Sequence, residues 1–204
     1  MSLFITSTDG ARRAMELVFR KSFRELALAA LLIGAPFGTC IAASSNQELK
    51  KIEEADQADR AVGSNKIDWD VVGKRDAARR ARTLEILRAG NIRTSDDYLN
   101  AAVVFQHGDA IEDTELALAL ATTASRMDAT NKDAKILTAQ ATDRILVKLG
   151  KPQWYGTQFS RSKSTGKWEM FPTEPSVVTE SQREAMGIPT LAETKAHLDA
   201  MNAK

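Results

Sequence analysis

Apolar and polar residues follow a helical period over most of residues 45–149. Five segments carry apolar residues three or four positions apart, and turn-forming residues separate them. The helices expected from this pattern cover residues 47–60, 71–89, 94–107, 112–126 and 132–149. Thr94-x-x-Asp97 predicts a capping box at the third helix, and Asn131 is expected to cap the fifth.

The pattern changes beyond the glycine at position 150. Short alternating segments at residues 158–161 and 167–171 predict a β-hairpin. Capping signals that begin at Thr179 and Thr190 predict two further helices. We therefore expect a mainly α fold, a single-domain helical bundle of about six to seven helices with one small β-hairpin after the fifth helix.

A short apolar run near the N-terminus predicts an export signal. Basic residues precede the run at residues 26–35, and small residues follow it at 42–44. This order is typical of a secretory signal peptide, and the run is shorter than the about 20 residues that cross a bilayer. We expect a signal peptide at residues 1–44, with Met15 as its physiological start. The mature domain at residues 45–204 would then lack a transmembrane segment and be periplasmic or secreted.

The charge and cysteine content of the expected mature chain argue against several classes of function. Of the 28 basic and 27 acidic residues, residues 1–44 hold five and three, which leaves a net charge of −1 on the remainder. This balance argues against a nucleic-acid partner or an anionic membrane surface. Cys40 is the one cysteine, and the residues before it lack the pattern of a lipidated cysteine. Disulfides and thiol catalysis are thus not expected.

Patterns for several kinds of chemistry are absent from the sequence. It contains no His-Glu-x-x-His pair, phosphate-binding loop, Gly-x-Ser-x-Gly turn or dinucleotide fingerprint. Its two histidines are His107 and His197. We therefore expect neither a metal site nor a cofactor.

Asp143 and His107 are the titratable residues most open to a functional interpretation. Asp143 lies on a largely apolar face of the 132–149 helix, and His107 lies at the end of the 94–107 helix. A buried carboxylate is seldom left without a partner, so a structural role for Asp143, such as accepting from a loop amide, is the commoner explanation. The alternative is an acid–base pair of His107 and Asp143, with Arg144 stabilising charge.

Residues 150–158 form the least ordinary segment of the chain. They combine two glycines and a proline with Trp154, Tyr155, Thr157 and two glutamines. Aromatic side chains often anchor a loop to a core, and they also suit stacking against a sugar or peptide. Both a structural and a binding role are consistent with this composition.

Several short motifs occur in an order that resembles a bacterial family known only as a domain of unknown function. They are Asp56-Gln57-x-x-Arg60, Asp97-Tyr98, Ala101-Ala102, Phe105-Gln106-His107-Gly108, Asp143-Arg144 and the 150–158 segment with its Gln153-x-Tyr155-Gly156-Thr157-Gln158 element. The resemblance covers most of residues 45–190 and implies one motif set, formed by Gln57, Arg60, Gln106, His107, Asp143, Arg144, Gln153, Tyr155, Thr157 and Gln158. We expect this set to converge on one polar cluster where the loop folds over the third and fifth helices.

Three functions are compatible with these residues. The preferred one is a non-enzymatic domain that binds an envelope ligand or protein through the 153–158 loop and the His107 region, with Gln57, Arg60 and Gln106 among its binding residues. The second is a hydrolase-like enzyme that uses His107 and Asp143. The third is a structural domain whose polar cluster only specifies the fold.

Overall fold

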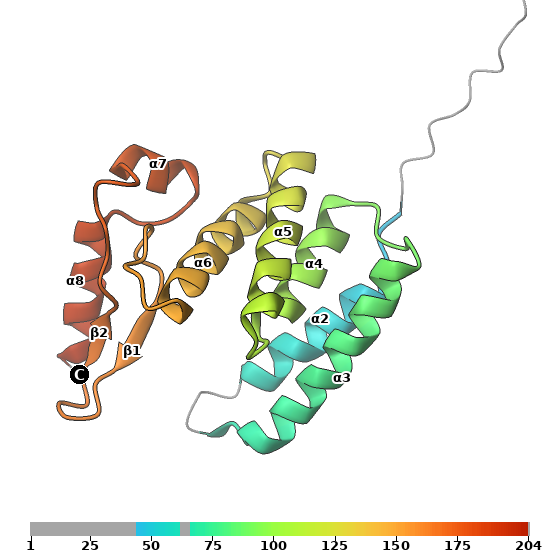
Figure 1. The fold of residues 1–204 in the computed structure, drawn as a ribbon, viewed down its shortest axis with the longest axis horizontal. Coiled ribbons are helices and arrows are strands. Elements are labelled where there is room, and N and C mark those ends of the chain that lie inside the picture. The colour runs from blue at the N-terminus through green and yellow to red at the C-terminus, as the bar shows by residue number, and fades with distance from the viewer. Residues whose placement is uncertain (1–43, 62–65, 204) are drawn as a thin grey trace, which may run out of the picture. The chain divides into compact units, whose positions relative to one another are not determined.

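Figure 1 shows the computed structural model, which describes residues 44–61 and 66–203 as seven helices and two short strands. In chain order the elements are α2 (Gln47–Arg60), α3 (Trp69–Arg88), α4 (Ser95–Gln106), α5 (Ile111–Met127), α6 (Lys132–Lys148), β1 (Phe159–Arg161), β2 (Trp168–Met170), α7 (Glu180–Ala185) and α8 (Leu191–Asn202). The expected mainly α fold, with an antiparallel hairpin after the fifth of these helices, is confirmed. The expected signal peptide lies outside the described residues. No helix within them has the length and apolar character that crossing a bilayer requires.

Side-chain caps mark where the helices begin. In the described part of the chain, six of the seven helices start at a residue whose side-chain oxygen accepts from the backbone amide three positions later. These cap residues are Asn46, Asp68, Thr94, Asn131, Thr179 and Thr190. Each satisfies an amide that the first turn leaves without a partner, which is why the signals at Thr94, Asn131, Thr179 and Thr190 predicted where four of these helices begin.

Alanines let α4, α5 and α6 pack closely. Buried alanines recur along the facing sides of these three helices: Ala101, Ala102, Ala117, Ala121, Ala124, Ala134, Ala139 and Ala141. Larger side chains from four helices, Leu49, Ile86, Phe105 and Leu120, close the same core. Small residues reduce the distance between helix axes, and the larger ones fill the remaining volume to the density typical of protein interiors.

The segment after α6 folds back on itself before the last two helices. Gln153 forms an isolated bridge with Thr173, in which the Gln153 amide donates to Pro172 O (2.8 Å) and the Glu174 amide donates to Gln153 O (2.8 Å). Further along, α8 packs against β2, and the side chain of Asn202 pairs with both backbone groups of Trp168. These contacts place the 150–158 loop next to the hairpin and fix where α8 lies.

Asp97 joins the start of α2 to the start of α4. Its carboxylate is 1% exposed, and Oδ1 accepts from the Asn46 amide at 2.6 Å. Oδ2 accepts from the amides of Arg93 (2.9 Å) and Thr94 (3.1 Å), which completes the capping box predicted at Thr94. Burial acts to raise the pKa of Asp97, but these amides outweigh burial and the net shift is downward.

Replacing Asp97 with Asn should lower the free energy of unfolding by about 1–3 kcal/mol at pH 7, because buried amides lose a charged acceptor. The folded pKa is depressed, so this contribution is complete above the unfolded value of about 4 and is lost as pH falls through the folded pKa. Denaturant titrations at pH 7 and pH 3 should show the gap between the Asp97→Asn variant and the native chain closing at low pH. The exposed neighbour Asp96, changed to Asn, is the matched control. A gap that is equal at both pH values would contradict this assignment.

Candidate functional site

One buried carboxylate on α6 organises the 150–158 loop. Asp143 is fully buried, and its Oδ1 accepts hydrogen bonds from the backbone amides of Trp154 (2.8 Å) and Tyr155 (2.9 Å). Its Oδ2 accepts from the backbone amide of Thr157 (2.9 Å) and from the Thr157 hydroxyl (2.8 Å). Four donors thus compensate for burying the charge, and they include loop amides, the partners that a structural role for Asp143 predicted.

Gly156 allows the loop to turn around this carboxylate. Its φ is +75°, in the left-handed region where other residues are strained. A Cβ placed there would lie 2.8 Å from Leu191 Cδ2 at the start of α8 and 3.4 Å from Met170 Sδ. The position therefore requires glycine both for its backbone conformation and for the close approach of α8.

Gln153 closes the loop from within. Its side chain is fully buried, and Nε2 donates to the carbonyls of Gln158 (3.1 Å) and Phe171 (2.9 Å). Its Oε1 accepts from the Gln158 amide at 2.8 Å. The donors and the acceptor of this amide are thus used inside the protein, where they hold the loop closed.

Arg183 holds the loop from the side opposite Asp143. It lies on α7, is fully buried, and donates from its two terminal nitrogens to the carbonyls of Tyr155 and, at 2.9 Å, Trp154. Its Nε lies 3.4 Å from a Glu180 carboxylate oxygen. The amides of residues 154 and 155 therefore face a negative charge, while their carbonyls face a positive one.

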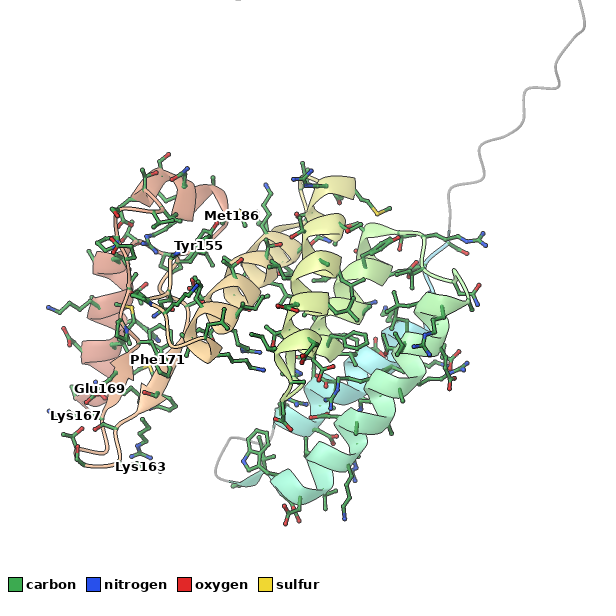
Figure 2. All side chains as sticks on the ribbon, in the orientation of Figure 1. Tyr155, Lys163, Lys167, Glu169, Phe171 and Met186 are labelled. Atoms are coloured by element: carbon green, nitrogen blue, oxygen red, sulfur yellow. The ribbon has the colours of Figure 1, made fainter. Side chains whose placement is uncertain are left out.

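The side chain of Tyr155 is half-buried, and Figure 2 labels it at the edge of the loop, with Phe171 in the segment that pairs with the loop. Burial and then the nearby charge of Asp143 raise the pKa of the Tyr155 phenol, partly offset by Arg183. The phenol therefore stays neutral at physiological pH and suits hydrogen bonding more than proton transfer.

Arg144 connects the loop to the end of α4. Its Nε donates to Gln158 Oε1 (3.3 Å), and one terminal nitrogen donates to the Gln106 carbonyl (2.5 Å). Gln158 in turn donates from Nε2 to Thr157 Oγ1 (3.0 Å) and to the Gln140 carbonyl (3.3 Å). Burial lowers the pKa of Arg144 from its ordinary value, yet a guanidinium stays charged. Its donors are thus used to join three segments of the chain.

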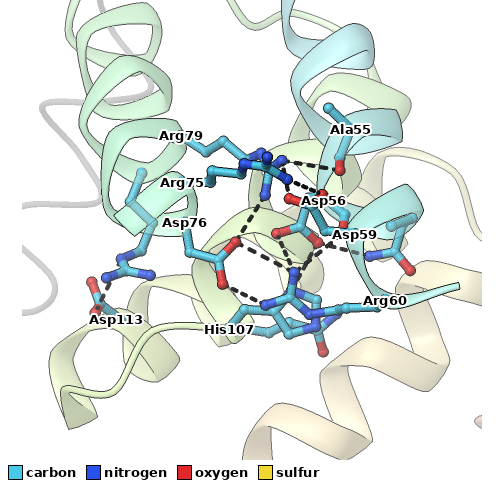
Figure 3. Close-up of polar contacts among 12 residues, drawn as sticks. Ala55, Asp56, Asp59, Arg60, Arg75, Asp76, Arg79, His107 and Asp113 are labelled. Carbon is cyan, nitrogen blue, oxygen red and sulfur yellow. Dashed lines mark hydrogen bonds and ion pairs between the residues drawn. The ribbon is translucent and has the colours of Figure 1, made fainter. Parts of the chain in front are cut away.

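A second polar network lies between α2 and α3, as Figure 3 shows. Arg60 contacts Asp56 Oδ1 at 3.1 Å and Asp76 Oδ2 at 2.6 Å. Arg79 contacts Asp76 Oδ1 at 2.9 Å and Asp59 Oδ2 at 2.5 Å. The pKa of Asp76, which burial would raise, is held below its ordinary value by these two arginines. Alternating charges thus connect two helices that bury few apolar side chains.

His107 belongs to this second network. Its Nδ1 lies 2.8 Å from Asp56 Oδ2, an ion-pair distance if the ring is protonated, although the N–H direction is poorly aligned for a hydrogen bond. Gln57 donates from Nε2 to the same Asp56 oxygen at 3.0 Å. Asp56 is fully buried, so each of these partners helps to compensate its charge.

The acid–base pair of His107 and Asp143, the alternative that the sequence left open, is therefore not formed. Asp143 is occupied by four loop donors, and the carboxylate beside His107 is Asp56. The predicted motif set divides into two networks instead of converging on one. The network around Asp56 contains Gln57, Arg60 and His107, and the network around the loop contains Gln106 (through its carbonyl), Asp143, Arg144, Gln153, Tyr155, Thr157 and Gln158.

A cleft of about 890 Å³ opens beside the loop network. Thr157 and Phe159 line it on the loop side, and Ile136 and Gln140 contribute from α6. The α7–α8 side adds a set of polar and apolar residues: Glu184, Ile188, Pro189, Glu193, Thr194 and His197. The cleft lining combines apolar side chains with a few polar groups, which is the usual composition of a ligand site.

Several residues of the two networks and the cleft were not singled out in the sequence. Arg183 is one arginine in a short polar helix, and no local pattern distinguishes it from a solvated residue. Phe159 and His197 lie in elements that the sequence predicted, but their common cleft depends on how α8 packs. Asp56 did have a signal, because it precedes Gln57 in a motif on the buried side of α2.

Among residues 44–61 and 66–203, no group of three or more histidine, cysteine, aspartate or glutamate side chains is arranged to hold a metal ion. No protein-family model, curated protein or solved structure matches this chain. The resemblance to a bacterial domain of unknown function therefore stays a prediction from the motifs.

Changing Asp143 to Asn should lower the free energy of unfolding by about 2–4 kcal/mol, because the amide keeps the shape but turns donors toward backbone N–H groups. Thermal and denaturant unfolding would measure the loss. Asp199→Asn, at an exposed position on α8, is the matched control and should stay within about 0.5 kcal/mol of the native chain. Equal stabilities of the two variants would show that Asp143 does not hold the loop.

The two histidines should differ in their effect on stability. His107→Ala should lower the free energy of unfolding by about 1–3 kcal/mol, because the buried Asp56 carboxylate loses one of its partners. His197→Ala, on the exposed side of α8, should leave unfolding nearly unchanged. Denaturant titration of both variants at pH 6 tests the difference, and an unchanged His107→Ala variant would contradict a role in the network.

Proposed function

We propose that residues 45–204 are a non-catalytic binding domain of an exported cell-envelope protein, and that its ligand or protein partner lies in the cleft beside the 150–158 loop. The proposal of export depends on the basic flank, the apolar run at 26–35 and the small residues at 42–44.

The observation that carries the proposal is the shape of the cleft wall. The backbone of residues 154–157 is held by Asp143 from α6 and by Arg183 from α7. Thr157, the last residue of this stretch, and Phe159, two positions further on, line the cleft. A wall fixed in this way is ordered before a ligand arrives, so binding loses less conformational entropy. This supports a binding role for the polar residues of the loop beyond specifying the fold.

The same contacts favour binding over hydrolysis. An acid–base pair needs a carboxylate that can orient a histidine, and both oxygens of Asp143 already accept from loop groups. His107 lies in the other network, beside Asp56, and it does not line the cleft. The histidine that does line the cleft is His197.

Phe159 gives a direct test of the cleft. Its side chain is 37% exposed and lines the cleft, whereas Trp168 on the paired strand is 38% exposed and does not. Phe159→Ser should weaken binding by about tenfold or more, because an aromatic contact in a binding site commonly contributes more than 1 kcal/mol. Trp168→Ser should leave the affinity unchanged.

The measurement is a titration of isotope-labelled protein by NMR with two probes, a pool of acetylated hexapeptides and N,N′-diacetylchitobiose. Binding by either probe should shift the amide signals of Thr157, Phe159, Thr194 and His197, which line the cleft. Signal changes that map outside the cleft, or equal affinities for the Phe159→Ser and Trp168→Ser variants, would refute the proposal.

A further inference from the structure

A second cavity continues the cleft across α6. It has a volume of about 360 Å³ and lies where residues of α2, α4 and α6 meet. Ile136 and Gln140 line both this cavity and the larger cleft. The two spaces therefore adjoin along one turn of α6, and together they are called the α6 groove below.

The face of α6 in this groove is long enough for an extended chain. Asp133, Ile136, Leu137 and Gln140 are spaced three, four and seven positions apart, so they lie on one side of the helix. The step from residue 133 to residue 140 is about 10 Å along the axis. This length matches about three residues of extended peptide, before the larger cleft adds further room.

The charged residues that line the groove are all acidic. Glu53 and Asp133 line the second cavity, and Glu184 and Glu193 line the larger cleft. No lysine or arginine lines either space among the described residues. Glu193 accepts a hydrogen bond from Thr190 as part of a helix cap. The other three carboxylates, those of Glu53, Asp133 and Glu184, form no ion pair within the described part of the chain. A ligand with positive charge would complement this surface.

Glu53 lines the second cavity and would be stabilised by a nearby cation. It is half-buried, and burial followed by the charges of Asp56 and Glu54 raises its pKa, while Lys50 lowers it. A carboxylate that burial and like charges destabilise is relieved by a positively charged partner at short range. The second cavity thus contains a negative group whose ionised form lacks a strong partner in the free protein.

Side-chain amides supply the remaining polar groups. Gln57, Asn100, Gln106 and Gln140 line the second cavity. Each amide carries both a donor and an acceptor, and so does each peptide unit of an extended chain. A neutral sugar could also bond to these amides and carboxylates, but it carries no positive charge to complement the four acidic groups. Amides together with acidic groups are best matched by a peptide that carries a basic side chain.

We propose that the α6 groove binds an extended peptide segment of another protein and that a lysine or arginine of this segment lies against Glu53 and Asp133. This inference rests on the proposed function, because the same segment would continue into the larger cleft past Gln140 and Phe159.

Three immobilised libraries of acetylated hexapeptides test the proposal. They are identical except at a fixed third position, which is lysine, norleucine or glutamate, and the measured quantity is the amount of labelled protein that each retains. The lysine library should retain about tenfold more protein than the norleucine library, and the glutamate library should retain the least. The preference for lysine should decrease as salt concentration rises.

Variants separate this inference from the proposed function. Glu53→Gln and Asp133→Asn should remove the preference for lysine while retention on the norleucine library stays unchanged. Glu115→Gln, at an exposed acidic position on α5 that lines neither space, is the matched control and should keep the preference. Equal retention on the lysine and norleucine libraries, with both reduced by Phe159→Ser, would overturn the cation site but keep the binding cleft. Retention that does not depend on Phe159 would overturn both.

Discussion

The burial of one carboxylate, Asp143, determines how the chain beyond α6 is arranged. Leaving a charge without partners in the interior is strongly unfavourable, so the loop must bring donors to it. The loop does so by pointing three backbone amides and a hydroxyl inward, which turns the carbonyls of residues 154 and 155 away. Those carbonyls then receive the guanidinium of Arg183, and α7 is placed as a result. The position of the cleft wall follows from this sequence of pairings.

In the other half of the described chain, buried charged groups also hold elements together, here the helices α2 and α3. α2 and α3 are rich in charged residues and bury few apolar side chains, so hydrophobic packing alone provides a limited contact between them. Carboxylates and arginines alternate across the interface, and Asp56 and Asp76 are both buried there. His107 extends this network to the end of α4. Such networks depend on every member being paired, and they define one relative position of the helices more strongly than apolar contacts would.

The two networks meet at the end of α4. Gln106 offers its carbonyl to Arg144 of the loop network, and the next residue, His107, faces Asp56 of the other. The α6 groove runs along the same region, because Gln57 and Gln106 line its second cavity and Gln140 lines both of its parts. The ordered backbone around the loop and the half-buried acidic groups near α2 are thus parts of one surface. This arrangement explains how residues distant in sequence could contribute to one extended binding site.

Local sequence patterns were sufficient to predict the helices and strands of this fold. They predicted few of the contacts between these elements. Caps such as Thr94, Asn131 and Thr190 act within one turn, so their patterns predicted helix starts that the structure confirms. Asp143 was recognisable because a carboxylate on an apolar helix face needs partners nearby in the fold. The packing of α2 against α4 determines which carboxylate faces His107. No local sequence pattern predicts this pairing. Arg183 and the cleft likewise depend on where α7 and α8 pack, since long-range pairing is decided by the complementarity of whole surfaces and not by the residues next to each other in the chain.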